Sequence, residues 1–393
     1  MAKFIFGCLL FCCFTLSAQG EADSLTTSAK TKTVFLKGYL GGLYIPTYIF
    51  GEKRIQNAAW IHNRLNFKFL PSSRWDISAE LRTRAMFQDF TGFTSKGDFK
   101  NVTQDAGWLN LSWNLATGRY GLFTTSIERL YAAYQTDRYS IKVGRQRINW
   151  SQALMFNPND IFNGYSFFDY DYPERQGSDA IRISAFPTGT SAIELATKMN
   201  YFGQLTLAGL YRFNVKGWDV QMLGGMVNKY DLMVGSGFSG DIKGVNVRGE
   251  YSYYHSTHLL PELRHTNVAS LGIDYIFKNA IMLSAEGLYN RLPPNYTSTL
   301  RTLYTVPMSP KFLSITEWTV CSQISYPFTP IVTGSFAAIS FINLPAFYLG
   351  PSIEYSVKNN LTLSAMLQTF VGDKNTMTPS GLLLGYARLK YHF

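Results

Sequence analysis

The segment from Val143 to Asp179 holds the densest group of side chains that could do chemistry. Two arginines lie in the run Gly144-Arg145-Gln146-Arg147, and several carboxylates follow them. A guanidinium presents a planar fork of N–H donors, so it binds a carboxylate or another anion through paired hydrogen bonds. These arginines could bind an anionic solute, or they could pin a loop through ion pairs, which we favour. With two arginines from an earlier strand, the candidate site residues are Arg82, Arg84, Arg145, Arg147, Asp160, Asp169, Asp171, Glu174 and Arg175.

The strand before Arg145 decides where its guanidinium can point. Both arginines of the run share parity with Tyr139 and Val143, which belong to an apolar face. If that face meets lipid, an arginine near the middle of the bilayer costs roughly 2–4 kcal/mol. Either the strand ends by Gly144, or a bulge turns the arginines to the other face.

The sequence gives only weak signals for catalytic, metal, cofactor or nucleic-acid sites. His255 and His258 lie near Glu262, but no oxyanion donor can be assigned to them, so we favour a polar loop over a catalytic site. Cys321 is the single cysteine beyond the N-terminal region, so neither an internal disulfide nor a cysteine metal cluster is expected. No phosphate-binding loop or haem motif is found, and the basic residues are spread along the chain. We therefore predict no enzymatic activity, no cofactor, no metal and no nucleic-acid partner.

The elements that must position these residues are strands. From Trp75 to Phe87 the apolar residues lie on one face, and Asp76, Glu80 and Arg82 lie on the other. A helix would scatter these charges around its circumference, whereas a period of two separates them. Several later segments repeat the pattern, which indicates strands with one apolar and one polar face.

The chain ends on such a strand. Leu389, Tyr391 and Phe393 share one face, and Lys390 and His392 share the other. A final strand with a terminal aromatic residue resembles that of bacterial outer-membrane β-barrels, where the barrel-assembly machinery reads it. We predict that Leu389, Tyr391 and Phe393 form this assembly signal.

The composition favours a transmembrane antiparallel β-barrel. Aromatic residues make up 16% of the chain and charged residues also 16%, whereas soluble domains carry about 25% charge. A soluble sandwich or propeller would also alternate, but its core would favour aliphatic residues over tyrosine. Aromatic residues recur at strand ends, as an interfacial girdle requires: Trp60, Trp75, Tyr139, Tyr201, Trp218, Tyr289 and Tyr326. We predict 18 strands, with 16 as the alternative, and long extracellular loops of which one folds into the lumen.

One stretch allows a second interpretation. Residues 318–353 lack charge, and 331–350 are long and apolar enough for a membrane helix. Pro327, Pro330 and Pro345, together with many β-branched and aromatic residues, favour two apolar strands that join near Asn343.

The N-terminus has the pattern of a secretory signal. Lys3 precedes an apolar run, and Ser17-Ala18 forms a plausible cleavage site. A lipoprotein leader, suggested by the cysteines in this run, is the weaker alternative. The predicted organisation is a signal peptide over residues 1–18, a mobile segment over 19–33 and the barrel over 34–393.

The motif-bearing part of the chain, from Leu122 to Phe186, carries a family resemblance. A strand that ends in Gly144-Arg145-Gln146-Arg147 and is followed by Asn157-Pro158-Asn159-Asp160 resembles Gram-negative outer-membrane porins. The similarity is to the superfamily that includes the alginate-export channels, and to outer-membrane proteins of the Bacteroidota. The resemblance implies an 18-stranded barrel and passive or facilitated passage of solutes.

The predicted function is an outer-membrane channel for small hydrophilic solutes, with the nine candidate residues at its lining and constriction. The net charge is +10, and the residues predicted by parity to point inward, Arg182 and Glu286 among them, carry a small excess of cations. This excess suggests a weak preference for anions, although basic residues could instead contact lipopolysaccharide outside. The alternative is a non-transporting barrel that serves a larger envelope complex. Expected partners are outer-membrane lipid, lipopolysaccharide and the assembly machinery, and either a homo-oligomer or a complex is compatible with the sequence.

Overall fold

The computed structural model describes residues 33–50, 53–89, 105–163, 177–259, 264–292, 309–344, 346–372 and 382–393. The stretch from Thr33 to Phe393 forms one compact unit. Within the described ranges there is no helix with the length and apolar character needed to cross a membrane. The predicted signal peptide and residues 19–32 lie outside the described residues.

Over its described residues, the unit consists of strands joined by turns and irregular connections. The strands are β1 (Val34–Ile49), β2 (Arg54–Ser72), β3 (Trp75–Gln88), β4 (Ser112–Thr117), β5 (Gly121–Gln135), β6 (Tyr139–Gln146), β7 (Ser178–Thr188), β8 (Ser191–Met199), β9 (Leu205–Val215), β10 (Trp218–Val227), β11 (Asp231–Ile242), β12 (Val245–Ser256), β13 (His265–Ile276), β14 (Met282–Asn290), β15 (Trp318–Thr329), β16 (Val332–Phe341), β17 (Ala346–Lys358), β18 (Leu361–Gly372) and β19 (Leu382–His392).

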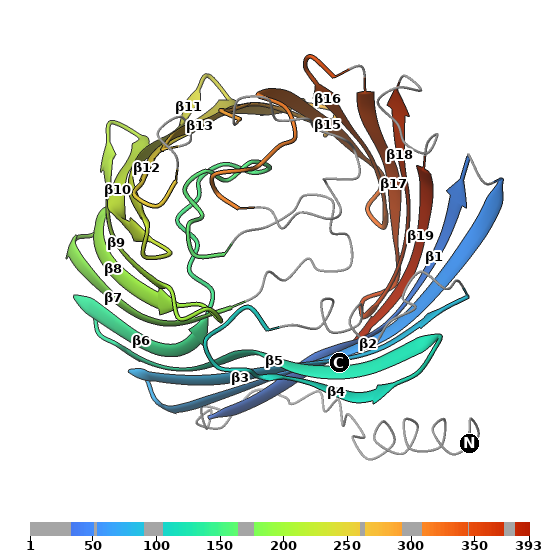
Figure 1. Cartoon of the computed structure of the whole chain (residues 1–393), viewed down its shortest axis with the longest axis horizontal. Helices are drawn as coiled ribbons and strands as arrows, with labels where there is room; N and C mark the ends of the chain where they lie inside the picture. Colours follow the sequence, from blue (N-terminus) through green and yellow to red (C-terminus); the bar gives the residue numbers. More distant parts are fainter. Residues whose placement is uncertain are drawn as a thin grey trace, which may run out of the picture. The chain divides into compact units, whose positions relative to one another are not determined.

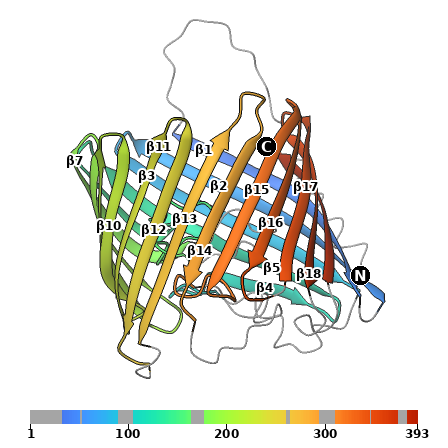
Figure 2. The same cartoon turned by 90° about the horizontal axis from the view of Figure 1, so that it is seen from above.

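Eighteen of these strands close into an antiparallel barrel, as the sequence predicted. Strand β1 pairs with β2 on one edge and with β19 on the other, which joins the two ends of the sheet. Closure leaves no open edge whose amides and carbonyls would lack partners in lipid. Figure 1 shows the ring of strands viewed along its axis, and Figure 2 shows the inclined strands from the side.

The alternation predicted for Trp75 to Phe87 appears in β3 as two unlike faces. Trp75 and Phe87 are about half exposed on the outer face, whereas Arg82 on the inner face is only 3% exposed. Large apolar side chains on the outer face of most other strands are exposed in the same way. The two-residue alternation of the sequence therefore corresponds to a barrel wall with an apolar outer face and a polar inner face.

The connections at one end of the barrel are short, and the C-terminus of the chain lies at the same end (Figure 2). Two of them are tight turns in which Lys216-Gly217 and Lys243-Gly244 have positive φ at both positions. Two-residue hairpin turns of this kind match the twist of the flanking strands. The long connections, including those before β7 and β15, lie at the other end. In outer-membrane barrels short turns are periplasmic and long loops extracellular.

The uncharged stretch forms strands, which confirms the preferred interpretation. Strand β16 ends at Phe341 and β17 begins at Ala346, so the join lies where Asn343 was expected. Because Asn343 adopts a φ of 69°, it provides the left-handed residue that the turn requires.

Strand β4 is the nineteenth strand and was not predicted. Residues 122–126 of β5 pair with β3 and also with β4, so these two neighbours occupy opposite edges of β5. Residues 130–135 of β5 pair with β6 on the same edge that β4 uses. Strand β6 leaves the wall after Gln146, and β4 occupies the part of the edge that β6 leaves open.

The chain that leaves the wall after β6 enters the barrel. Residues 147–163, named the inner segment below, run inside the ring of strands (green in Figure 1). Ile148, Trp150, Ile161 and Phe162 of this segment are buried against inward side chains of β7 to β12. This confirms that a loop folds into the lumen.

Candidate functional site

The candidate site is the lumen wall, where charged residues from neighbouring strands form a network. The Arg64 guanidinium donates to Glu128 at 3.2 Å and also pairs with Glu80. Arg129 lies 3.1 Å from the Glu80 carboxylate. A register shift between β3 and β5 beside residue 128 lets two consecutive residues of β5, Glu128 and Arg129, reach this inner network.

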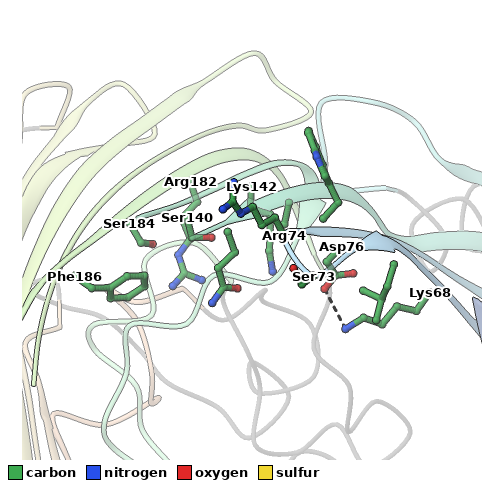
Figure 3. Close-up of a pocket in the computed structure, with 13 residues that line it drawn as sticks. Lys68, Ser73, Arg74, Asp76, Ser140, Lys142, Arg182, Ser184 and Phe186 are labelled. Carbon is green, nitrogen blue, oxygen red and sulfur yellow. Dashed lines mark ion pairs between the residues drawn. The ribbon is translucent and has the colours of Figure 1, made fainter. Parts of the chain in front are cut away.

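Next to the network lies a basic pocket of about 350 Å³ near the short-turn end. Its charged lining residues are Lys68, Arg74, Asp76, Lys142 and Arg182. Figure 3 shows these side chains converging from β2, β3, β6, β7 and, for Arg74, the turn between β2 and β3. One cation, Lys68, pairs with Asp76 at 3.1 Å, and both groups are partly exposed. With four cations and one carboxylate, the pocket carries an excess of positive charge.

A second pocket of about 430 Å³ continues the basic surface toward the seam between β1 and β19. It also combines four cations with one carboxylate: Lys37, Arg64, Arg129 and Lys390 with Glu80. The Lys390 ammonium lies 3.8 Å from the ring centroid of Tyr39, which holds it by a cation–π contact. The cationic surface therefore extends over β1, β2, β3, β5, β6, β7 and β19.

The inner segment covers much of the wall from β8 to β12. The Trp150 indole donates to Glu194 of β8 at 2.8 Å, and Gln221 of β10 donates to the Trp150 carbonyl at 2.7 Å. Lys198 of β8 donates to the carbonyl of Phe162 near the other end of the segment. One side of the lumen is thus lined by wall cations and the other by a bound loop.

Solved structures with the same architecture are bacterial outer-membrane proteins. Acinetobacter baumannii OccAB2 matches with a TM-score of 0.61 and 10% identity over 92% of this chain and 98% of that chain. Pseudomonas aeruginosa OccK7 (OpdD) matches with a TM-score of 0.57 and 8% identity over 92% and 98%. Pseudomonas aeruginosa OccK3 (OpdO) matches with a TM-score of 0.57 and 10% identity over 92% and 95%.

The chain has the fold of outer-membrane porins. At these identities the likeness concerns the fold. No family model matches the sequence, and no curated protein sequence is similar to it.

Within this porin fold, Arg145 lies in an ion-pair cluster in the wall. Its guanidinium binds Asp179 through two bonds of 2.7 and 2.9 Å and Asp105 at 2.6 Å. It also donates to the carbonyl of Leu109 at 2.6 Å. Neither carboxylate is among the partners that the sequence suggested, which were Asp160 and three residues outside the described ranges.

The register places this cluster on the outer face. Arg145 is opposite Asp179, which shares parity with the exposed Ile181 on β7. The strand continues through Gly144, whose φ of 115° is a conformation that favours glycine. The strand therefore neither ends at Gly144 nor turns Arg145 to the lumen. Residues 105–111, named the cover below, lie over Arg145, so its guanidinium is buried although it points outward.

The remaining predicted site residues fall in three places. Arg147 and Asp160 belong to the inner segment, where the Asp160 carboxylate accepts the N–H of Asn163 at 3.2 Å. Arg82 and Arg84 lie on the inner face of β3, and Arg82 approaches Glu128 at 4.0 Å. Asp169, Asp171, Glu174 and Arg175 lie outside the described residues. A role in the constriction stays a prediction for all of them.

Several residues that shape the lumen were not among the predicted site residues. Parity alone identified Arg182 and Glu286 as inward, yet it gave no reason to prefer them over other inward charges. Lys142 also follows from parity, because it alternates with the outward Ile141 and Val143. Their convergence depends on strand order and stagger, which the sequence does not display.

The histidines near the long-loop end occupy polar surroundings. The Tyr253 hydroxyl lies 2.7 Å from Nδ1 of His265, and the ring of His258 stacks on Tyr230. Glu262 lies outside the described ranges. In the part of the chain that the structure describes, no group of three or more His, Cys, Asp or Glu residues is arranged to hold a metal ion.

Proposed function

We propose that this protein is an outer-membrane channel that lets small hydrophilic solutes diffuse through its lumen, with a preference for anions. The barrel architecture and the apolar outer face are consistent with the outer membrane. The observation that carries the proposal is the polar lumen with two open pockets, each with an excess of cations.

The distribution of carboxylates supports the anion preference. Glu250 and Glu286 are 4% and 3% exposed because the inner segment lies over them. On the opposite wall Lys68 and Arg182 keep 46% and 29% of their side chains exposed, whereas Arg64 and Arg82 keep 3% each. A mobile ion in the lumen therefore meets mainly positive groups, and rings of such groups favour anions.

The proposal predicts that reversing charges in the first pocket weakens anion selectivity. We expect Lys142→Glu with Arg74→Glu to lower the anion-to-cation permeability ratio by about two-fold or more, because both side chains line the lumen. The measurement is the reversal potential of the refolded protein in a planar bilayer across a salt gradient.

Lys278→Glu is the matched control. Lys278 is an exposed residue in the turn between β13 and β14 and does not line either pocket. Reversing the charge of Lys278 should leave the anion-to-cation permeability ratio close to that of the wild type. A wild-type protein that folds but never conducts would refute the channel function and favour a non-transporting barrel. Equal effects of both changes would refute the role of the pocket.

The finer resemblance, to alginate-export channels and Bacteroidota proteins, is also a proposal. Its support is strand β6, which ends at Gln146 within the Gly-Arg-Gln-Arg run and is followed by a segment that enters the lumen and contains an Asn-Pro-Asn-Asp run. Assays with oligosaccharides of graded size would test whether the solute range extends to sugars.

A further inference from the structure

Two carboxylates of the lumen wall bind the main chain of the inner segment. The first is Glu250 of β12, which lies near the middle of its strand. Its Oε1 accepts the N–H of Ala153 at 2.8 Å and also the N–H of Gln152. Its Oε2 accepts the N–H of Asn159 at 3.0 Å, and the Ser151 hydroxyl adds a bond of 2.8 Å.

The second carboxylate is Glu286 of β14. Its Oε2 accepts the N–H groups of Leu154 and Met155 at 3.2 and 3.1 Å. Its Oε1 accepts the N–H of Phe156 at 2.7 Å. The two carboxylates therefore satisfy every main-chain donor from residue 152 to residue 156.

This arrangement has a simple physical basis. The inner segment forms no strand in this region, so its amides need partners other than a sheet ladder. A buried carboxylate in turn requires several donors, because an isolated buried charge is very unfavourable. Hydrogen bonds to an ionised acceptor are stronger than neutral ones, and consecutive N–H groups form a concave site for an anion.

The two ends of the inner segment are held separately. Glu194 and Gln221 bind Trp150 near the start, and Lys198 binds the carbonyl of Phe162 near the end. Asn159 is also bound by Ser236 and Ser252, and the side chains of Met155 and Phe156 pack in an apolar cluster of the wall. Loss of the two central carboxylates would therefore release the main-chain amides of residues 152–156, while Asn159 and both ends stay attached.

We propose that Glu250 and Glu286 are positioning residues that set the width of the channel by holding residues 152–159 against β12 and β14. The proposal rests on the channel function proposed above. The inner segment faces the basic wall across the lumen. Any displacement of the segment therefore changes the cross-section of the lumen that is open to solutes.

The test uses the full-length mature protein with Glu250→Gln, Glu286→Gln and the double substitution. Glutamine keeps the size of the side chain and removes its charge. In planar bilayers we expect the double variant to change the mean single-channel conductance by about two-fold or more, with added open-channel noise. Glu354→Gln is the matched control, because Glu354 is an exposed inward residue of β17 and is not among the residues that bind the main chain of the inner segment.

A second measurement does not depend on conduction. Hydrogen exchange read by mass spectrometry should show that amides 152–156 are protected in the wild type. In the double variant we expect them to exchange roughly tenfold faster. Strand amides and the Glu354→Gln protein should keep wild-type rates.

A reversible disulfide between the inner segment and β12 tests whether reattaching the segment restores the conductance. The Ser252 hydroxyl lies 2.8 Å from the Asn159 side chain, so Asn159→Cys with Ser252→Cys can link the segment to β12. In the double variant, with Cys321→Ala to remove the free thiol, oxidation should restore wild-type conductance and reduction should release it.

The outcomes separate the two proposals. A folded double variant with wild-type conductance, noise and exchange would overturn the positioning role. Faster exchange with unchanged conductance would also overturn it, since the segment would then not set the width. A wild-type protein that does not conduct would refute the channel itself, and the exchange rates would still show whether the carboxylates hold the segment.

Discussion

At the scale of single residues, the charged side chain of Arg145 is kept from lipid because ion-pair and hydrogen-bond partners surround it. Arg145 has outward parity, yet Asp179 from β7 and Asp105 from the cover neutralise it. Leu109 and Ile127 accept further N–H bonds from the same guanidinium. The sequence suggested ion pairs for this arginine, but with other carboxylates and on the lumen side of the wall. It could not identify Asp105, because that residue lies across a long connection and carries no periodic signal.

Removal of this arginine should be costly. We expect Arg145→Ala to lower the free energy of unfolding by about 3–5 kcal/mol, because two buried carboxylates would lose their counter-ion. Urea titration of the refolded barrel, followed by tryptophan fluorescence, measures the change.

Lys68→Ala serves as the control for this prediction. Its ion pair with Asp76 is partly exposed, so the expected loss is about 0–1 kcal/mol. A similar loss for both variants would contradict the structural role of the Arg145 cluster.

At the scale of elements, the alternation of side chains and the turn residues predicted most of the fold. Strand β3 and the join at Asn343 follow from side-chain parity and from residues that tolerate positive φ. Strand β4 was missed, because it is short and pairs with only part of β5. The bonds from Glu250 and Glu286 were missed for a different reason. Their donors are main-chain amides, which every residue except proline possesses and which leave no mark in a sequence.

The backbone conformation of β6 at position 144 depends on a glycine. A Cβ at Gly144 would lie 2.2 Å from the carbonyl oxygen of Leu130, and the φ of 115° is unfavourable for any other residue. We expect Gly144→Ala to destabilise the barrel by roughly 1–3 kcal/mol. The same urea titration tests it.

Gly189→Ala is the control for this prediction, because a Cβ at Gly189 would meet no atom within 4 Å. If the two glycine variants unfold at the same urea concentration, the strain assigned to Gly144 is absent.

At the scale of the whole molecule, the first and last strands of the barrel, β1 and β19, meet at one seam. The amide and carbonyl of Phe393 exchange hydrogen bonds of 3.0 and 2.9 Å with Gly38 of β1. Its ring also packs over Gly38, where a Cβ would lie 2.8 Å from the ring. The last residue therefore belongs to the closure of the barrel, in addition to its predicted part in the assembly signal with Leu389 and Tyr391.

We expect Phe393→Ala to reduce the fraction of protein that assembles in the outer membrane. The readout is the share of heat-modifiable, folded protein on a gel after expression in a Gram-negative host. His392→Ala is the control, because His392 faces the lumen side of the same strand. Equal assembly of both variants would show that the terminal aromatic ring is dispensable.

The cover over Arg145 has a consequence for biogenesis. If β6 and β7 entered the bilayer ahead of residues 105–111, a cation would meet hydrocarbon before its counter-ion Asp105 arrived. That state is disfavoured, so the stretch from β3 to β8 should insert as one preassembled sheet rather than hairpin by hairpin. Cells that produce a protein without the cover should therefore accumulate it in the periplasm, stalled before integration.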